Sequence, residues 1–153
     1  MAVLEPKKRG GPDELTFVSA DRIAGKSQAQ RSYSDFAING RRLHGILHRD
    51  FISVFGWLDR ARERKYARAL LPAGKSESRA ALYICPECAD HGCGFFSVKV
   101  AISGDCIVWS EPGWEDDLHI SSTPAPFVAG PGGPWRDLWF DQAQYRAALG
   151  FYR

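Results

Sequence analysis

Apolar and polar residues alternate most regularly in the middle of the chain. From residue 96 to residue 102, every second position is large and apolar: Phe96, Val98, Val100 and Ile102. This period of two predicts a strand with one buried face. The pair Gly104-Asp105 predicts a tight turn, and residues 106–111 the returning strand of a hairpin. The register that follows sets these residues opposite one another: Ser103 and Cys106, Ile102 and Ile107, Val100 and Trp109, Val98 and Glu111.

Shorter patterns predict two further strands and a loop. Residues 80–85 form an apolar run typical of a strand. Residues 33–38 alternate and end at Asn39-Gly40, two residues that tolerate positive φ, so a turn and a returning strand over 41–47 are expected. Residues 111–134 are rich in proline and glycine, which predicts a long loop.

Capping residues predict two helices. Asp59 is placed to cap a helix over residues 60–71, which Pro72 ends. Asp141, with Gln144 three residues later, has the spacing of a capping box and predicts a terminal helix to Gly150. Together these elements indicate a single α+β domain, with an antiparallel sheet around a central hairpin and two helices packed on it.

Length and composition agree with one ordinary soluble domain. The chain has 153 residues, of which 44% are hydrophobic and 25% charged, enough for a core that needs no disulfide or metal. We expect residues 1–31 to form a flexible or partly ordered arm with one short strand at Leu15–Val18, and residues 32–153 to form the domain. No apolar run approaches the ~20 residues that span a bilayer. No apolar segment follows the basic residues 7–9, so we expect a protein of the reducing cytoplasm.

The formal net charge of +2 hides an opposition between the two halves of the chain. Residues 1–75 hold 15 Lys and Arg against 8 Asp and Glu, whereas residues 76–153 hold 5 against 10. In one fold the two halves either face each other or mix over the surface. Nucleic-acid binding through the basic N-terminal half is an alternative, although no basic stripe with interleaved aromatics accompanies it.

Three of the four cysteines lie in the connection between two predicted strands. Cys85, Cys88 and Cys93 stand within nine positions, together with His91. A Cys-x2-Cys turn lets two sulfurs reach one tetrahedral Zn²⁺ at about 2.3 Å. The candidate zinc ligands are therefore Cys85, Cys88, His91 and Cys93. Cys106 is excluded, because the hairpin register places it about 33 Å from Cys93.

Two alternatives to zinc remain open for these cysteines. Cys85 and Cys88 could act as a redox dithiol. The residues after Cys88 cannot form the helix that activates such a thiol, and the acids Glu87 and Asp90 disfavour a thiolate. The cysteines could also be small, buried, reduced residues of a tight turn.

An edge rich in tryptophan and acids is the candidate partner-binding surface. Extended past Gly113, the hairpin register brings Phe95 opposite Trp114 and Cys93 near Asp116, at the cysteine end of the sheet. Exposed aromatic residues beside acids are more typical of protein-docking surfaces than of active sites. The candidate partner-binding residues are Trp114, Glu115, Asp116, Asp117 and Trp135.

Two blocks of the sequence resemble a group of small, uncharacterised bacterial proteins. These have a CPxCxDxGC turn before a hairpin that ends in Trp, and a C-terminal F-D-x-x-x-Y helix. The matching blocks here are residues 82–114 and residues 140–149. Cys85, Cys88, Asp90, Gly92 and Cys93 match the motif, whereas the position of His91 often holds another residue. Members are sometimes labelled oxidoreductase, so the resemblance implies a thiol-dependent activity.

No complete catalytic constellation emerges from the sequence. We therefore expect a non-enzymatic cytoplasmic protein-binding module of an inhibitor, immunity or regulatory type, with zinc stabilising its cysteine turn. Its expected partner is a protein and not a membrane. The first alternative is a thiol-dependent oxidoreductase that uses Cys85 and Cys88, and the second is a nucleic-acid-binding protein.

Overall fold

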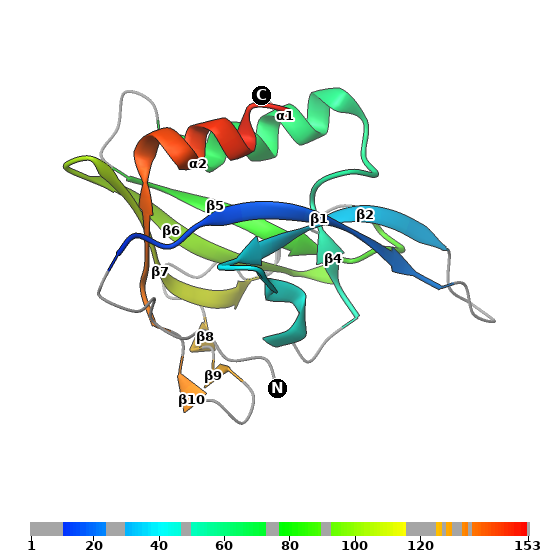
Figure 1. Cartoon of the computed structure of the whole chain (residues 1–153). Coiled ribbons are helices and arrows are strands. Elements are labelled where there is room, and N and C mark those ends of the chain that lie inside the picture. The colour runs from blue at the N-terminus through cyan, green and yellow to red at the C-terminus, as the bar shows by residue number, and fades with distance from the viewer. Residues whose placement is uncertain are drawn as a thin grey trace.

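The computed structural model confirms the α+β class. It describes residues 11–23, 30–46, 50–72, 77–89, 93–115, 125–126, 128–129, 133–134 and 136–152. Within these residues, every pair of named strands is antiparallel. Two helices, α1 (Arg60–Ala69) and α2 (Gln142–Leu149), complete the fold. Both lie on the same side of the strands (Figure 1).

The larger sheet has the strand order β11-β7-β6-β5-β4, and β8 pairs with the far end of β7. Its strands are β4 (Ile52–Ser53), β5 (Glu77–Ile84), β6 (Phe95–Ser103), β7 (Cys106–Glu115), β8 (Ala125–Pro126) and β11 (Leu138–Asp141). The smaller sheet consists of β1 (Leu15–Arg22), β2 (Arg31–Ile38) and β3 (Arg41–Arg42). A separate pair joins β9 (Val128–Ala129) and β10 (Gly133–Pro134).

The strand expected within the N-terminal segment is present and longer than expected. β1 pairs with β2 along its whole length, from Leu15 opposite Ile38 to Arg22 opposite Arg31. Leu15 is fully buried, and the Gln144 side chain accepts from its N–H at 3.1 Å and donates to its C=O at 2.6 Å. The first strand is therefore tied to the last helix and contributes to the core.

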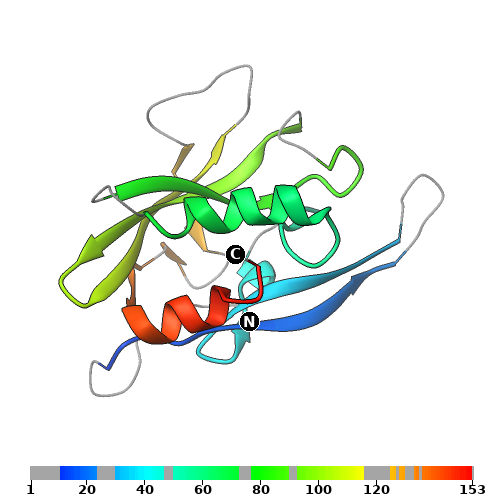
Figure 2. The same ribbon diagram turned by 90° about the horizontal axis from the view of Figure 1, so that it is seen from above.

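Both helix caps are confirmed. Asp59 accepts a hydrogen bond from the Arg62 N–H at 2.9 Å, and Asp141 accepts one from the Gln144 N–H at 3.0 Å. Viewed from above, α2 lies beside β1, and α1 lies over β5 (Figure 2). None of the helices in the described ranges is long and apolar enough to cross a membrane.

The predicted hairpin register is confirmed from the turn as far as Lys99, which lies opposite Ser110. Beyond that point it is wrong by one residue, because Ser97 lies opposite Gly113 and Phe95 opposite Glu115. A bulge causes the shift, with Glu111 in the left-handed region at φ 49°. Without the bulge, the Glu111 carboxylate would share the core face with buried residues. Instead it is exposed and pairs with Lys99 at 2.8 Å.

Two other predictions from local pattern are corrected. The strand expected over residues 41–47 is only the two residues of β3, followed by the short 3-10 helix η2 (Leu43–Ile46), because fully buried Leu43 turns into the core. The long loop does not begin at residue 111. β7 continues to Glu115, since the bulge restores its pairing with β6.

Gly56 allows a close approach between two segments. It has φ 92°, and a Cβ there would lie 2.6 Å from the backbone nitrogen of Ser34. In the turn at Gly56, the backbone N–H groups of Gly56, Trp57 and Leu58 all donate to one carboxylate oxygen of Glu63, over 2.7–2.9 Å. The approach to α1 therefore depends on the absence of a side chain at this position.

We expect Gly56→Ala to destabilise the protein far more than Gly40→Ala does. Both glycines have positive φ, but nothing lies within 4 Å of a Cβ built at Gly40. The left-handed conformation alone costs alanine about 1–2 kcal/mol, whereas the clash with Ser34 raises the cost at Gly56 to about 3 kcal/mol or more. Urea unfolding of both variants measures the difference. Equal losses of unfolding free energy would contradict the close approach.

Candidate functional site

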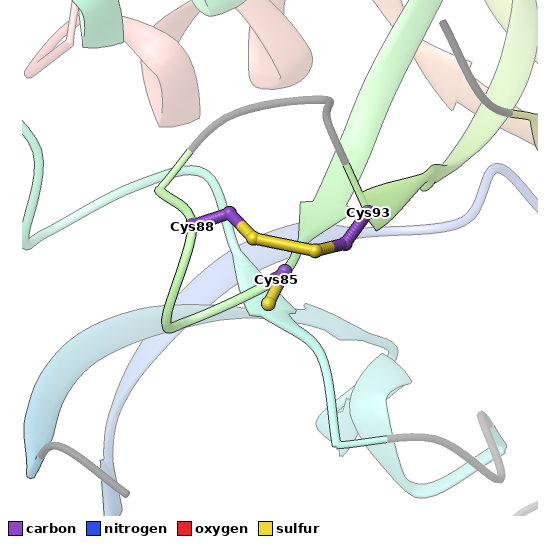
Figure 3. Close-up of side chains that lie close together, drawn as sticks. All are labelled: Cys85, Cys88 and Cys93. Carbon is purple, nitrogen blue, oxygen red and sulfur yellow. A yellow bond between two sulfur atoms is a disulfide. The ribbon is translucent and has the colours of Figure 1, made fainter. Parts of the chain in front are cut away.

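Three cysteine sulfurs converge where β5 passes into β6. Cys85 directly follows β5, and Cys93 comes two residues before β6. The sulfur atoms of Cys85, Cys88 and Cys93 all lie within 4.8 Å of one another (Figure 3). Cys106 is not in this group, as the hairpin register predicts, because it begins β7 opposite Ser103.

Two of the three cysteines are joined by a disulfide. Cys88 and Cys93 form the bond, with their Cα atoms 6.8 Å apart, while Cys85 and Cys106 are free thiols. Cys88 and Cys93 are exposed, and Cys85 is half-buried. Cysteines that serve only as small packing residues are buried, so the packing alternative is wrong for Cys88 and Cys93.

The backbone bends sharply after each member of the disulfide. Ala89 follows Cys88 with φ 57°, and Gly94 follows Cys93 with φ 91°. The left-handed conformation is free for glycine but costs alanine about 1–2 kcal/mol. Ala89 keeps it because its N–H donates to the Cys85 carbonyl at 3.0 Å, which closes the Cys-x2-Cys turn.

Three arginines from separate elements hold this turn. Arg22 of β1 pairs with Glu87 at 2.6 Å. Arg31 of β2 donates through Nε to the Pro86 carbonyl at 3.1 Å, and its guanidinium carbon lies 5.1 Å from the centre of the Trp57 ring. Arg62 of α1 donates to the Ala89 carbonyl at 2.8 Å. These contacts fix successive residues of the turn from three directions.

Arg22 is the most buried of the three arginines. Its side chain is only 8% exposed, and it pairs with Asp50 at 2.7 Å as well as with Glu87. The hydrogen bond with Asp50 raises the pKa of Arg22, burial opposes this effect, and Glu87 adds to it. Arg22 therefore offsets only part of the negative charge that Glu87 brings to the cysteine turn, because it shares its charge with Asp50.

One ion pair at this site, Arg22–Glu87, joins the basic and the acidic half of the chain. All three arginines come from the basic residues 1–75, and the turn that they hold belongs to the acidic residues 76–153. Sequence reasoning did not identify Arg22, Arg31 or Arg62 as site residues. The opposite net charges of residues 1–75 and 76–153 indicate that the two halves attract each other, but they do not predict which arginine contacts which carbonyl.

The candidate partner-binding residues are only partly within the described chain. Trp114 is half-buried and packs edge-on against Phe51 and Phe96, with ring centres 5.3 and 5.2 Å away. The Glu115 side chain is 8% exposed, lies 3.4 Å from Arg79 and accepts a hydrogen bond from Ser97. Four predicted site residues lie outside the described residues: His91, Asp116, Asp117 and Trp135.

The arrangement has two chemical capacities. With all thiols reduced, three sulfurs can ligate one soft or borderline metal ion. With Cys88 and Cys93 oxidised, the Cys85 thiol lies beside a disulfide that it can attack. The two capacities exclude each other, because a sulfur in a disulfide is no longer a thiolate ligand.

Comparison with protein-family models, with curated proteins and with solved structures finds no match for this chain. What the cysteine turn does is therefore inferred from its own residues.

We expect Arg22→Gln to loosen the cysteine turn. The substitution removes two charge-assisted hydrogen bonds, but both carboxylates are about half exposed, so the unfolding free energy should fall by only about 1–2 kcal/mol. Amide exchange at Ala89 should accelerate, as followed by hydrogen-exchange mass spectrometry. Arg68→Gln, at an exposed position of α1, is the matched control. Unchanged exchange in Arg22→Gln would show that the arginine does not hold the turn.

Proposed function

We propose that the cysteine turn is a zinc site, and that the protein is a zinc-stabilised protein-binding module rather than an enzyme. The observation that carries the zinc site is the convergence of three sulfur atoms within 4.8 Å. Around a tetrahedral zinc ion with bonds of about 2.3 Å, sulfurs lie about 3.8 Å apart. Sulfur atoms within 4.8 Å of one another are therefore close to the separation that such a site requires.

The residues that the structure describes supply three of the four ligands that a tetrahedral site needs. Among those residues, no further His, Asp or Glu joins the three cysteines. His91 stands between Cys88 and Cys93 in the sequence and completes a Cys3His donor set, a common combination in structural zinc sites. In the reducing cytoplasm that we propose as its compartment, Cys88 and Cys93 are thiols and available to the metal.

The arginines around the turn bear on the charge and on the shape of the proposed zinc site. Three thiolates and one Zn²⁺ together carry one net negative charge, and Arg31, which pairs with no carboxylate among the described residues, is the nearby cation that can stabilise it. Arg31 and Arg62 also hold the carbonyls of Pro86 and Ala89, so the turn is shaped before metal binds. Bound zinc would supply a cross-link between the ends of β5 and β6, not a reaction.

Exposed aromatic residues support the binding role. Trp139 on the outer strand β11 is 47% exposed, and Phe151 after α2 is 83% exposed. Large aromatic side chains are typical anchors of protein interfaces. Nucleic-acid binding is less well supported, because Arg22, Arg42 and Arg62 of the basic half pair with carboxylates of the same chain.

A second candidate function is thiol–disulfide exchange, which the Cys88–Cys93 disulfide next to free Cys85 favours. The Cys85 thiolate would attack the sulfur of Cys88, forming a Cys85–Cys88 disulfide and releasing Cys93 as a thiolate. One disulfide is broken and one is formed, so the exchange needs no external oxidant. The released Cys93 thiolate could then attack a disulfide in another protein, forming a mixed disulfide with one of its sulfurs and releasing the other as a thiolate.

Metal analysis distinguishes the two functions. Purified with reductant and zinc, the chain should hold one zinc per molecule, and Cys85→Ser should lose it, because a ligand is removed. Cys106→Ser is the matched control and should keep the metal. At free zinc about a thousand times the dissociation constant, binding stabilises the folded state by about 4 kcal/mol, so a chelator should lower the unfolding temperature clearly.

The opposite result supports the second function. If the reduced wild-type chain binds no zinc, and its oxidised form shifts between Cys88–Cys93 and Cys85–Cys88 disulfides in peptide mapping, the zinc site is overturned.

The binding role has its own test. We expect Trp139→Ser to abolish capture of a specific protein partner by the immobilised chain, because the indole is the exposed anchor of β11. Ile23→Ser is the control, since Ile23 is 81% exposed but follows the far end of β1. Size-exclusion chromatography of each variant mixed with the captured partner measures how much complex forms. Equal loss in both variants, or in neither, would contradict a surface at Trp139.

A further inference from the structure

A pocket of about 290 Å³ lies between α1 and the larger sheet. It is separate from the cysteine turn, and the zinc proposal does not depend on it. Its lining residues come from one helix and three strands: Lys65, Tyr66, Ala69, Arg79, Ala81, Phe95 and Glu115. Small-molecule sites in proteins begin at about this size.

The walls of the pocket are mostly apolar. Tyr66 and Ala69 of α1 face Ala81 and Phe95 of the sheet across the space. Tyr66, Ala69 and Phe95 are half-buried and contribute part of their surface to the pocket. Two aromatic side chains and two alanines make a surface that suits a compact apolar group.

A polar network fixes one cation at the end of this apolar space. Arg79 donates through Nε to the hydroxyl of fully buried Ser97 at 2.9 Å and through Nη2 to its carbonyl at 3.3 Å. The Ser97 hydroxyl donates in turn to Glu115, whose carboxylate lies 3.4 Å from Nε of Arg79. Within the described residues, Nη1 of Arg79 has no hydrogen-bond partner.

The charges around the pocket favour an anion. Lys65 is exposed at the rim and forms no ion pair with any described residue. Glu115 is the carboxylate that lines the pocket, and it already pairs with Ser97 and Arg79. Glu111 also acts on Arg79 through its charge, but it is paired with Lys99. Burial lowers the pKa of Arg79, and Glu115 and Glu111 oppose this effect without cancelling it, as expected for a partly desolvated guanidinium. The charged residues that line the pocket are Arg79, Lys65 and Glu115, and their net charge of one positive matches one monovalent anion.

We propose that this pocket binds a small monocarboxylate with a compact apolar body. Nη1 of Arg79 and the Lys65 ammonium hold the carboxylate, in charge-assisted hydrogen bonds that a neutral group cannot match. The apolar body lies between Tyr66 and Phe95. A phosphate ester carries close to two negative charges, which is more than the net positive charge of Arg79, Lys65 and Glu115 can balance.

The probe for this site is 3-phenylpropanoate, and its neutral control is 3-phenylpropanamide, which has the same shape. Titration calorimetry should show saturable binding of the acid, with the amide about tenfold weaker or more because it lacks the charge. Lys65→Gln should weaken binding of the acid about two- to fivefold and leave the amide unchanged. Arg68→Gln removes an equal charge from the same helix outside the pocket and should change neither.

A filling substitution tests the location without disturbing the polar network. Ala69→Leu adds a side chain that occupies the apolar space, and it should abolish binding of the acid while the unfolding temperature stays close to that of the wild type. Equal affinity for acid and amide, no saturable binding of the acid, or binding that survives Ala69→Leu would each overturn the proposal. Metal content measured on the same Ala69→Leu sample should be unchanged, which separates this site from the zinc site.

Discussion

A buried chain of two hydrogen bonds joins three elements of the fold. The indole N–H of Trp109 in β7 donates to the Tyr145 hydroxyl of α2 at 3.0 Å, and that hydroxyl donates to the Leu70 carbonyl after α1 at 2.8 Å. Burial raises the pKa of Tyr145 above its ordinary range, so the hydroxyl remains a donor. All three residues are fully buried, where a lost partner is costly. Both helices are thereby held on one side of the sheet.

The position of α1 determines which of its side chains reach the cysteine turn and which line the pocket. Arg62 near its start reaches the Ala89 carbonyl of the cysteine turn. One helical turn later, Lys65 and Tyr66 line the pocket against β5 and β6. A single helix therefore serves two sites, and its end is fixed by Tyr145. The hydrophobic core and the two candidate sites depend on the same packing.

The cysteine turn and the pocket are close along the chain but differ in chemistry. Phe95, which lines the pocket, comes two residues after Cys93. The turn offers sulfur ligands and is held by arginines, whereas the pocket offers an apolar space beside the partly buried guanidinium of Arg79. The bulge at Glu111 contributes to both regions, because it shifts β7 so that Trp114 packs on Phe96 and Glu115 reaches Arg79.

Local interactions allowed much of the fold to be predicted from the sequence. The caps at Asp59 and Asp141, and the hairpin register up to Lys99, depend on residues within a few positions of one another, and so does the Cys-x2-Cys turn. The bulge, the pocket and the arginine contacts could not be predicted in this way. Arg22 and Glu87 are 65 positions apart, and Arg31 and Pro86 are 55 apart. Only the packing of β1, β2 and α1 against the sheet brings such residues together, because hydrophobic burial determines that packing without regard to sequence separation.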